Sequence, residues 1–179
     1  MSIATGQCFP DFIKRNNDAG TPTESAHSMR SNLEKWYLEP LGKMSGDEAF
    51  VCLCGCFPIY EKFLRATGKI GEEEHFTEGH AVFEYLGSKW GCSKQVAFEV
   101  WSNWRNGLLH QAMVKRDEKY TFFMSGADEF DRAVNERGHE IIVNPWKLRE
   151  CLFNAIQGKR EIWKDDDYPF MKIYHRGEA

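Results

Sequence analysis

Between Ser93 and Val114, apolar residues recur at the spacing of an amphipathic α-helix. Each residue of a helix turns about 100°, so one group of side chains shares a side: Ala97, Phe98, Trp101, Trp104, Leu108, Leu109 and Ala112. Arg105 projects from within this apolar stripe. Because burying an unpaired guanidinium is costly, we expect it to face a carboxylate, a subunit interface or a bound anion. This feature favours a helical fold.

The polar residues of the same helix are predicted on its opposite side: Glu99, Asn103, Asn106 and His110. On a regular helix His110 lies about 140° around from Arg105, a gap that a flexible arginine side chain can bridge. Gly107 stands between these two residues, and glycine inside a helix costs about 1 kcal/mol relative to alanine. It therefore indicates a close backbone approach or a local bend.

The run Arg105-Asn106-Gly107-Leu108-Leu109-His110 resembles the Arg-x4-6-His signature of HEPN domains. This helical superfamily includes many prokaryotic toxin and defence ribonucleases, and a polar residue often follows the arginine. The resemblance covers roughly residues 28–158. Many members carry an aromatic residue two positions after the histidine, where this chain has Ala112.

A second pair, Arg132 and His139, also has Arg-x6-His spacing. The glycine-containing segment 135–138 between them indicates a turn and has no helical periodicity. We therefore carry the family's site only onto the first pair.

The resemblance implies a metal-independent endoribonuclease without a cofactor, in which two motifs meet across the two-fold axis of a homodimer. His110 is then the proton-transfer residue, Arg105 binds the phosphate, and Asn106 orients the phosphate or the histidine. Glu61 and Glu99 are candidate supporting residues. The implied partners are RNA or a nucleotide, with an antitoxin or regulatory protein also possible in toxin or defence biology.

Two other interpretations stay open. In one, Arg105 pairs with a carboxylate such as Glu61 to fix the helical bundle, and His110 is solvated. Glu61 and Arg65 can alternatively form an exposed ion pair at four-residue spacing. In the other, a catalytically silent HEPN-like module binds nucleotide, RNA or a protein partner through the same cleft.

Length and charge limit the class of protein. A chain of 179 residues with 42% hydrophobic residues can bury the core of one domain without disulfides or metal. Its net charge of −4 argues against non-specific coating of nucleic acid. No apolar stretch approaches the length of a membrane helix, and the N-terminus lacks the apolar run of a signal peptide. We expect a cytoplasmic protein without membrane contact.

The pattern along the chain predicts a mainly α, HEPN-like bundle of about five helices. An irregular arm (1–27) precedes a single domain (28–179). Helices are expected from Ser28 to Glu39-Pro40, from the capping box Ser45–Glu48 to Thr67, over 77–87, over 93–114, and after Asn144-Pro145. Residues 115–143 are predicted to hold an antiparallel β insertion built from the runs 120–124 and 140–143.

The cysteines do not form a metal or disulfide pattern. Cys52, Cys54 and Cys56 lie in one apolar run, and steps of two residues cannot converge on one helical face. We expect them to be buried as small hydrophobic residues.

Overall fold

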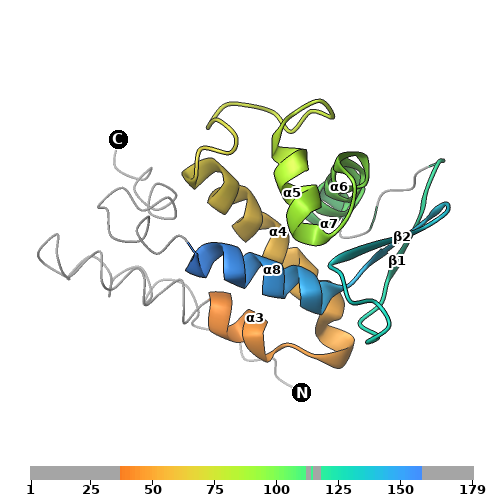
Figure 1. Ribbon diagram of the computed structural model, residues 1–179. Coiled ribbons are helices and arrows are strands. Elements are labelled where there is room, and N and C mark those ends of the chain that lie inside the picture. The colour runs from red at the N-terminus through yellow and green to blue at the C-terminus, as the bar shows by residue number, and fades with distance from the viewer. Residues whose placement is uncertain (1–36, 112–113, 115–117, 159–179) are drawn as a thin grey trace, which may run out of the picture.

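The computed structural model of the chain (Figure 1) describes residues 37–111, 114 and 118–158, and the side chains of 109–111 lie outside this description. The described part is mainly helical, with a small three-stranded sheet. It holds five helices when the contiguous segments from Lys94 to Gln111 are counted as one. The prediction of a mainly α chain is therefore confirmed. The predicted arm 1–27 and the chain beyond 158 lie outside the described residues.

The helix predicted from Ser28 is described only from Tyr37 onward. Tyr37 and Leu38 form a π-helical segment that runs directly into α3 (Glu39–Lys43). The expectation that this helix ends at Glu39-Pro40 is wrong, because the helical residues continue to Lys43.

The predicted capping box and long second helix are confirmed. The Ser45 N–H donates to the Glu48 carboxylate at 2.9 Å. A short 3₁₀ segment, η2 (Gly46–Glu48), then leads into α4 (Ala49–Ala66), which contains Pro58.

The third helix is displaced from its predicted position. It is α5 (Val82–Trp90) and ends at Gly91, whose φ of 80° is the left-handed conformation that glycine adopts without strain. Val82 and Leu86 are buried as predicted. Ala81 instead precedes the helix and is exposed.

The helix that carries the motif has three contiguous parts: α6 (Lys94–Val100), η3 (Trp101–Arg105) and α7 (Asn106–Gln111). Its predicted start is confirmed, because the Ser93 hydroxyl accepts a hydrogen bond from Val96 N–H at 3.2 Å. The prediction of a regular α-helix throughout this segment is wrong at η3, which is a π-helical turn.

The insertion before the last helix is a mixed sheet rather than the antiparallel one predicted. Its strands are β1 (Thr121–Met124), β2 (Val134–Arg137) and β3 (Glu140–Val143), in the order β1-β3-β2. The pair β2 and β3 is antiparallel, joined through Gly138 at a φ of 63°. The two predicted strands, β1 and β3, pair in parallel, because the segment predicted as a turn contains β2 and the chain reverses direction both before and after it.

The last helix, α8 (Pro145–Gln157), begins as predicted. The Asn144 side chain accepts from the N–H groups of Trp146 and Lys147 at 3.1 and 3.2 Å. Its amide also donates to the Phe130 carbonyl at 2.9 Å, so one buried side chain caps α8 and holds the loop before β2.

The core lies between the helices, with α4 packed along α8 and α5 packed against α6 (Figure 1). Its centre is aromatic: the Trp101 ring meets Phe57 edge-on at 6.0 Å and stacks with Trp90 at 6.4 Å. Cys52 and Cys56 are fully buried, as predicted, and Cys54 is half-buried. A hydrogen bond with Cys52 and burial raise the pKa of Cys56, which keeps this thiol protonated.

We predict that Asn144→Ala lowers the free energy of unfolding by about 1–3 kcal/mol, because it removes an N-cap and leaves the Phe130 carbonyl without its donor. Urea denaturation measures this loss. Asn154→Ala, an exposed position of the same helix, serves as control and should change stability by less than about 0.5 kcal/mol. Equal effects of the two substitutions would contradict the role of Asn144.

Candidate functional site

The helix that carries the motif includes Asn103 in its π turn η3. Asn103, predicted on the polar side, is buried with 7% exposure. Seven residues make nearly two full turns of a regular helix, so Asn103 shares a side with the buried Val96 and its burial follows from helical spacing. The Asn103 amide donates to the Glu99 carbonyl at 3.0 Å and to the Glu99 carboxylate at 3.3 Å. Gly107, which indicated an irregularity, lies in α7 itself, directly after this turn.

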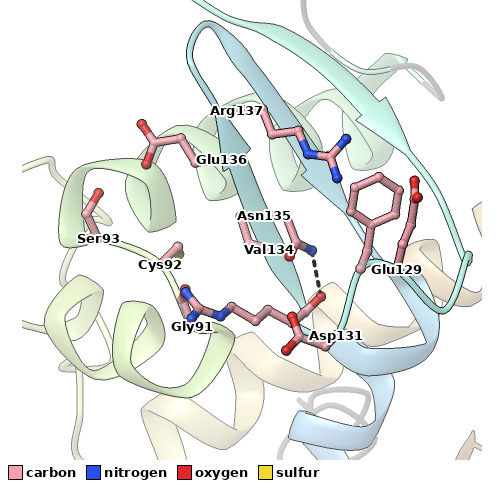
Figure 2. Close-up of a pocket in the computed structure, with 11 residues that line it drawn as sticks. Gly91, Cys92, Ser93, Glu129, Asp131, Val134, Asn135, Glu136 and Arg137 are labelled. Carbon is pink, nitrogen blue, oxygen red and sulfur yellow. Dashed lines mark hydrogen bonds between the residues drawn. The ribbon is translucent and has the colours of Figure 1, made fainter.

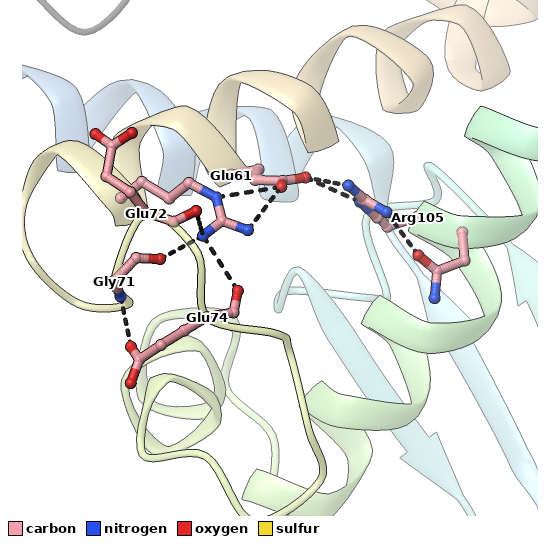
Figure 3. A network of polar contacts seen from close by, with 7 residues as sticks. Glu61, Gly71, Glu72, Glu74 and Arg105 are labelled. Carbon is pink, nitrogen blue, oxygen red and sulfur yellow. Dashed lines mark hydrogen bonds and ion pairs between the residues drawn. The ribbon is translucent and has the colours of Figure 1, made fainter.

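Arg105 ends the π turn and reaches α4 (Figure 3). Its Nε donates to Glu61 Oε2 at 3.1 Å, and its Nη2 forms a close ion pair with the same oxygen. Its Nη1 donates to the Asn106 side-chain oxygen at 2.7 Å. The expectation that Arg105 faces a carboxylate is therefore met by Glu61 of the same chain.

The other oxygen of Glu61 is held by a second arginine. Arg65, one turn further along α4, donates from Nη2 to Glu61 Oε1 at 3.2 Å. The i, i+4 pair is present as predicted, but it is partly buried rather than exposed. Glu61 thus bridges two guanidinium groups (Figure 3).

Arg65 also fixes the loop that follows α4. Its Nη1 donates to the carbonyl oxygens of Gly71, Glu72 and Glu74 at 2.5, 2.9 and 3.2 Å. The Gly71 N–H in turn donates to the Glu74 carboxylate at 2.5 Å, and this hydrogen bond lowers the pKa of Glu74, with the charges of His80 and Arg65 adding to the effect. Arg65 therefore connects the loop 71–74 to Glu61 on α4.

An aromatic contact connects the same loop to the π turn. The Arg65 guanidinium lies 5.2 Å from the centre of the Phe76 ring, and that ring stacks on Trp101 at 4.5 Å. Trp101 is the first residue of η3 and Arg105 is the last. Arg105 is consequently positioned both by Glu61 and by the stacked rings at the other end of its turn.

Two guanidinium groups share the Glu61 carboxylate in a partly desolvated place. The ion-paired side chains of Glu61, Arg65 and Arg105 are only 17–19% exposed. Arg65 also interacts electrostatically with the Glu74 carboxylate of the loop that it holds. Attraction between Glu61 and Arg105 is strengthened where water is excluded, and this orients the Arg105 guanidinium.

The remaining predicted site residues are described in part. Asn106 contacts Arg105 as stated, and Glu99 accepts from Gln95 at 2.9 Å and from Asn103, so it supports the π turn. The backbone of His110 lies in α7, and its side chain is outside the described residues.

Sequence reasoning identified Arg65 only as an ion-pair partner of Glu61. Its contacts with the loop carbonyls were missed, and no local pattern could have revealed them, because carbonyl groups carry no residue-type signal. Phe76 was missed for a similar reason: it follows an acidic run and belongs to no helical stripe.

The second Arg-x6-His pair is not a site of this kind. Arg132 donates to the Gly91 carbonyl at 3.1 Å and lines a cleft of about 490 Å³ between the α5–α6 junction and β2 (Figure 2). His139 lies in the turn at the opposite end of β2. The cleft wall mixes both charges, with Asp131 and Glu136 beside Arg132 and Arg137.

Within residues 37–111, 114 and 118–158, no group of three or more His, Cys, Asp or Glu side chains could hold a metal ion. No helix of that same part of the chain has the length and apolar character needed to cross a membrane. The chain matches no family model, no curated protein and no solved structure.

We predict that Glu61→Ala destabilises the fold more than Arg105→Ala does. The first leaves two partly buried guanidinium groups without their shared partner, for a loss of about 1–3 kcal/mol in the free energy of unfolding. The second leaves Glu61 paired with Arg65. Urea denaturation of both variants and of the double variant measures the coupling.

Lys147→Ala, which breaks the exposed pair with Glu150, is the control and should have little effect. Equal losses for Glu61→Ala and Arg105→Ala would show that Arg65 does not share the carboxylate.

Proposed function

We propose that this chain is a HEPN-like helical domain that acts as a metal-independent endoribonuclease through Arg105, Asn106 and His110. The observation that supports the proposal is that Glu61 and Asn106 orient the Arg105 guanidinium without using all of its N–H donors. An oriented guanidinium is the group needed to bind a phosphodiester and to stabilise the charge that grows on it.

Arg105 keeps donors for such a ligand. A guanidinium has five N–H donors, and those of Nε, Nη2 and Nη1 that contact Glu61 and Asn106 account for three of them. One N–H on each terminal nitrogen is left over in this set of contacts. Arg105 can therefore hold Glu61 and a phosphate oxygen at the same time.

In the proposed reaction, the His110 imidazole accepts the proton of the RNA 2′-hydroxyl as the 2′-oxygen attacks phosphorus. The bond from phosphorus to the 5′-oxygen breaks, and the departing oxygen takes a proton from a general acid. The family resemblance implies that two motifs meet across a homodimer, and in this proposal the His110 of the second copy is that acid. The products are a 2′,3′-cyclic phosphate and a 5′-hydroxyl end.

The same proposal includes a cytoplasmic location and a role in toxin or defence biology, with an antitoxin or regulatory protein as partner. The location is the expectation from the apolar pattern of the sequence, and the biological role and partner follow from the family resemblance alone. None of the three is used in the argument from Glu61 and Arg105.

A second candidate is a catalytically silent module that binds RNA, nucleotide or protein. The observation favouring it is that Arg105 already has an internal partner, so that its position can serve the fold. It predicts that ligand binding survives His110→Ala and that the parent protein does not cleave RNA.

For the nuclease, we predict RNA cleavage that persists in EDTA and that falls at least 100-fold in His110→Ala, since general acid–base catalysis contributes about 10²–10⁴-fold. The products should carry 2′,3′-cyclic phosphate ends, seen by mass spectrometry. His139→Ala, an exposed histidine in the β2–β3 turn, is the matched control and should cleave like the parent. Loss of cleavage in EDTA, or an active His110→Ala variant, would overturn the proposal.

A further inference from the structure

Two buried thiols face each other on α4. The Sγ atoms of Cys52 and Cys56 lie 4.0 Å apart, within hydrogen-bonding distance for sulfur, and neither residue is exposed to solvent. Cys54 stands between them in the sequence and is half-buried. Because two residues turn about 200° of a helix, Cys54 lies on another side and cannot join the pair. The pair is therefore a preassembled set of two sulfur donors.

The two thiols cannot close into a disulfide while α4 stays helical. Residues four positions apart on a helix have their Cβ atoms about 5–6 Å apart, whereas a disulfide needs a separation of about 3.5–4.5 Å. Helix α4 continues without interruption through both cysteines. Oxidation of this pair would require the helix to unwind, so the geometry favours two thiols that stay reduced.

The number of donors restricts the metal that they can bind. A tetrahedral zinc ion or an iron–sulfur cluster takes four protein ligands, and the described residues hold no group of three or more His, Cys, Asp or Glu side chains at metal-binding distance. Thiolates favour Cu(I), a soft ion that is stable with two of them. With metal–sulfur bonds near the zinc value of about 2.3 Å, two bonds span at most about 4.6 Å, so one ion can bridge these sulfurs.

Arg149 of α8 supplies a charge of the right sign. The pKa of Cys52 is lowered chiefly by its hydrogen bond with Cys56, and the charge of Arg149 adds to this effect against that of burial. One Cu(I) ion with two thiolates carries a net charge of −1. Arg149 offsets this charge in a place without solvent, where an uncompensated ion would be costly. A divalent ion with the same ligands would be neutral and would gain less from Arg149.

We propose that Cys52 and Cys56 bind one Cu(I) ion between their sulfur atoms, as a two-coordinate site inside the helical core. The ion enters as Cu(I) and forms two bonds to sulfur, and the two thiol protons pass to solvent. No electron is transferred in this step. The inference does not rest on the proposed function.

Helix α3 gives the ion its route to the thiols in this proposal. Leu41 is the buried residue of this five-residue helix. A Cβ atom added at Gly55 would lie 2.7 Å from the Leu41 side chain, so Leu41 packs directly on α4 beside Cys56 in the sequence. Arg149 holds α3 there by donating to the Leu41 and Met44 carbonyls at 2.7 and 2.8 Å. Local release of this short helix uncovers the thiol face while α4 stays folded.

Competition for copper tests the ligands. The reduced parent, mixed without oxygen with one equivalent of Cu(I) and the chelator bathocuproine disulfonate, should retain one ion per chain. Cys52→Ala and Cys56→Ala should each weaken binding by about 100-fold or more, because each removes half of the ligands. Cys54→Ala on the same helix, and Cys8→Ala outside the described residues, are the controls and should bind like the parent. A comparable loss in either control would overturn the assignment.

X-ray absorption spectroscopy of the copper-loaded parent makes the test independent of how the variants fold. The proposal predicts two sulfur neighbours around copper and no nitrogen or oxygen neighbour. A third sulfur, or any nitrogen or oxygen ligand, would contradict it, and so would a parent that retains no copper.

Urea denaturation separates the folded site from the thiols of the unfolded chain. An ion that binds the folded state stabilises it, and binding to the unfolded state works against this. Cu(I) should therefore raise the unfolding midpoint of the parent and leave that of Cys56→Ala unchanged. An unchanged or lower midpoint in the parent would overturn a site in the folded core. RNA cleavage is not a readout, so failure here leaves the proposed function untouched.

Discussion

The carboxylate of Glu61 is the point on which the candidate site depends. It joins α4 to the end of the π turn through Arg105, and it joins the same helix to the loop 71–74 through Arg65. A single acidic group between two guanidinium groups holds both in place, and the loop and the turn are in addition connected by the stacked rings of Phe76 and Trp101. The contacts form a closed ring, so a displacement of any one of these side chains would disturb the contacts of the others.

The pair between Glu61 and Arg105 can serve two different roles. Pairing between Glu61 and Arg105 is what a purely structural role requires, and it is also what keeps a guanidinium oriented before a ligand arrives. The two roles differ in what Arg105 must still offer: the fold needs only the pair with Glu61, whereas a ligand needs the N–H donors that this pair leaves over. Preorganised charge of this kind lowers the reorganisation needed when an anion binds.

Several parts of the fold were predictable because their signals are local. The capping box at Ser45 and Glu48, the Ser93 cap and the Asn144-Pro145 start depend on side chains next to the backbone groups they satisfy. The buried positions Val82, Leu86, Leu148 and Leu152 followed from helical spacing. Predictions failed where distant partners decide: β2 was assigned to a turn, and β1 and β3 pair in parallel because the chain reverses direction on both sides of β2.

The sequence by itself determined the helical class, the helix starts and the presence of Arg105 in an apolar stripe that needs a counter-charge, since periodicity and capping are read from neighbouring residues. The sequence named Glu61 as a candidate partner of Arg105 and, alternatively, of Arg65; the tertiary structure decided that Glu61 pairs with both and that Arg65 also holds the loop 71–74. Glu61 and Arg105 are 44 positions apart, and only the packing of the Arg105 helix against α4 brings them together. Sequence spacing cannot encode a contact made across two helices.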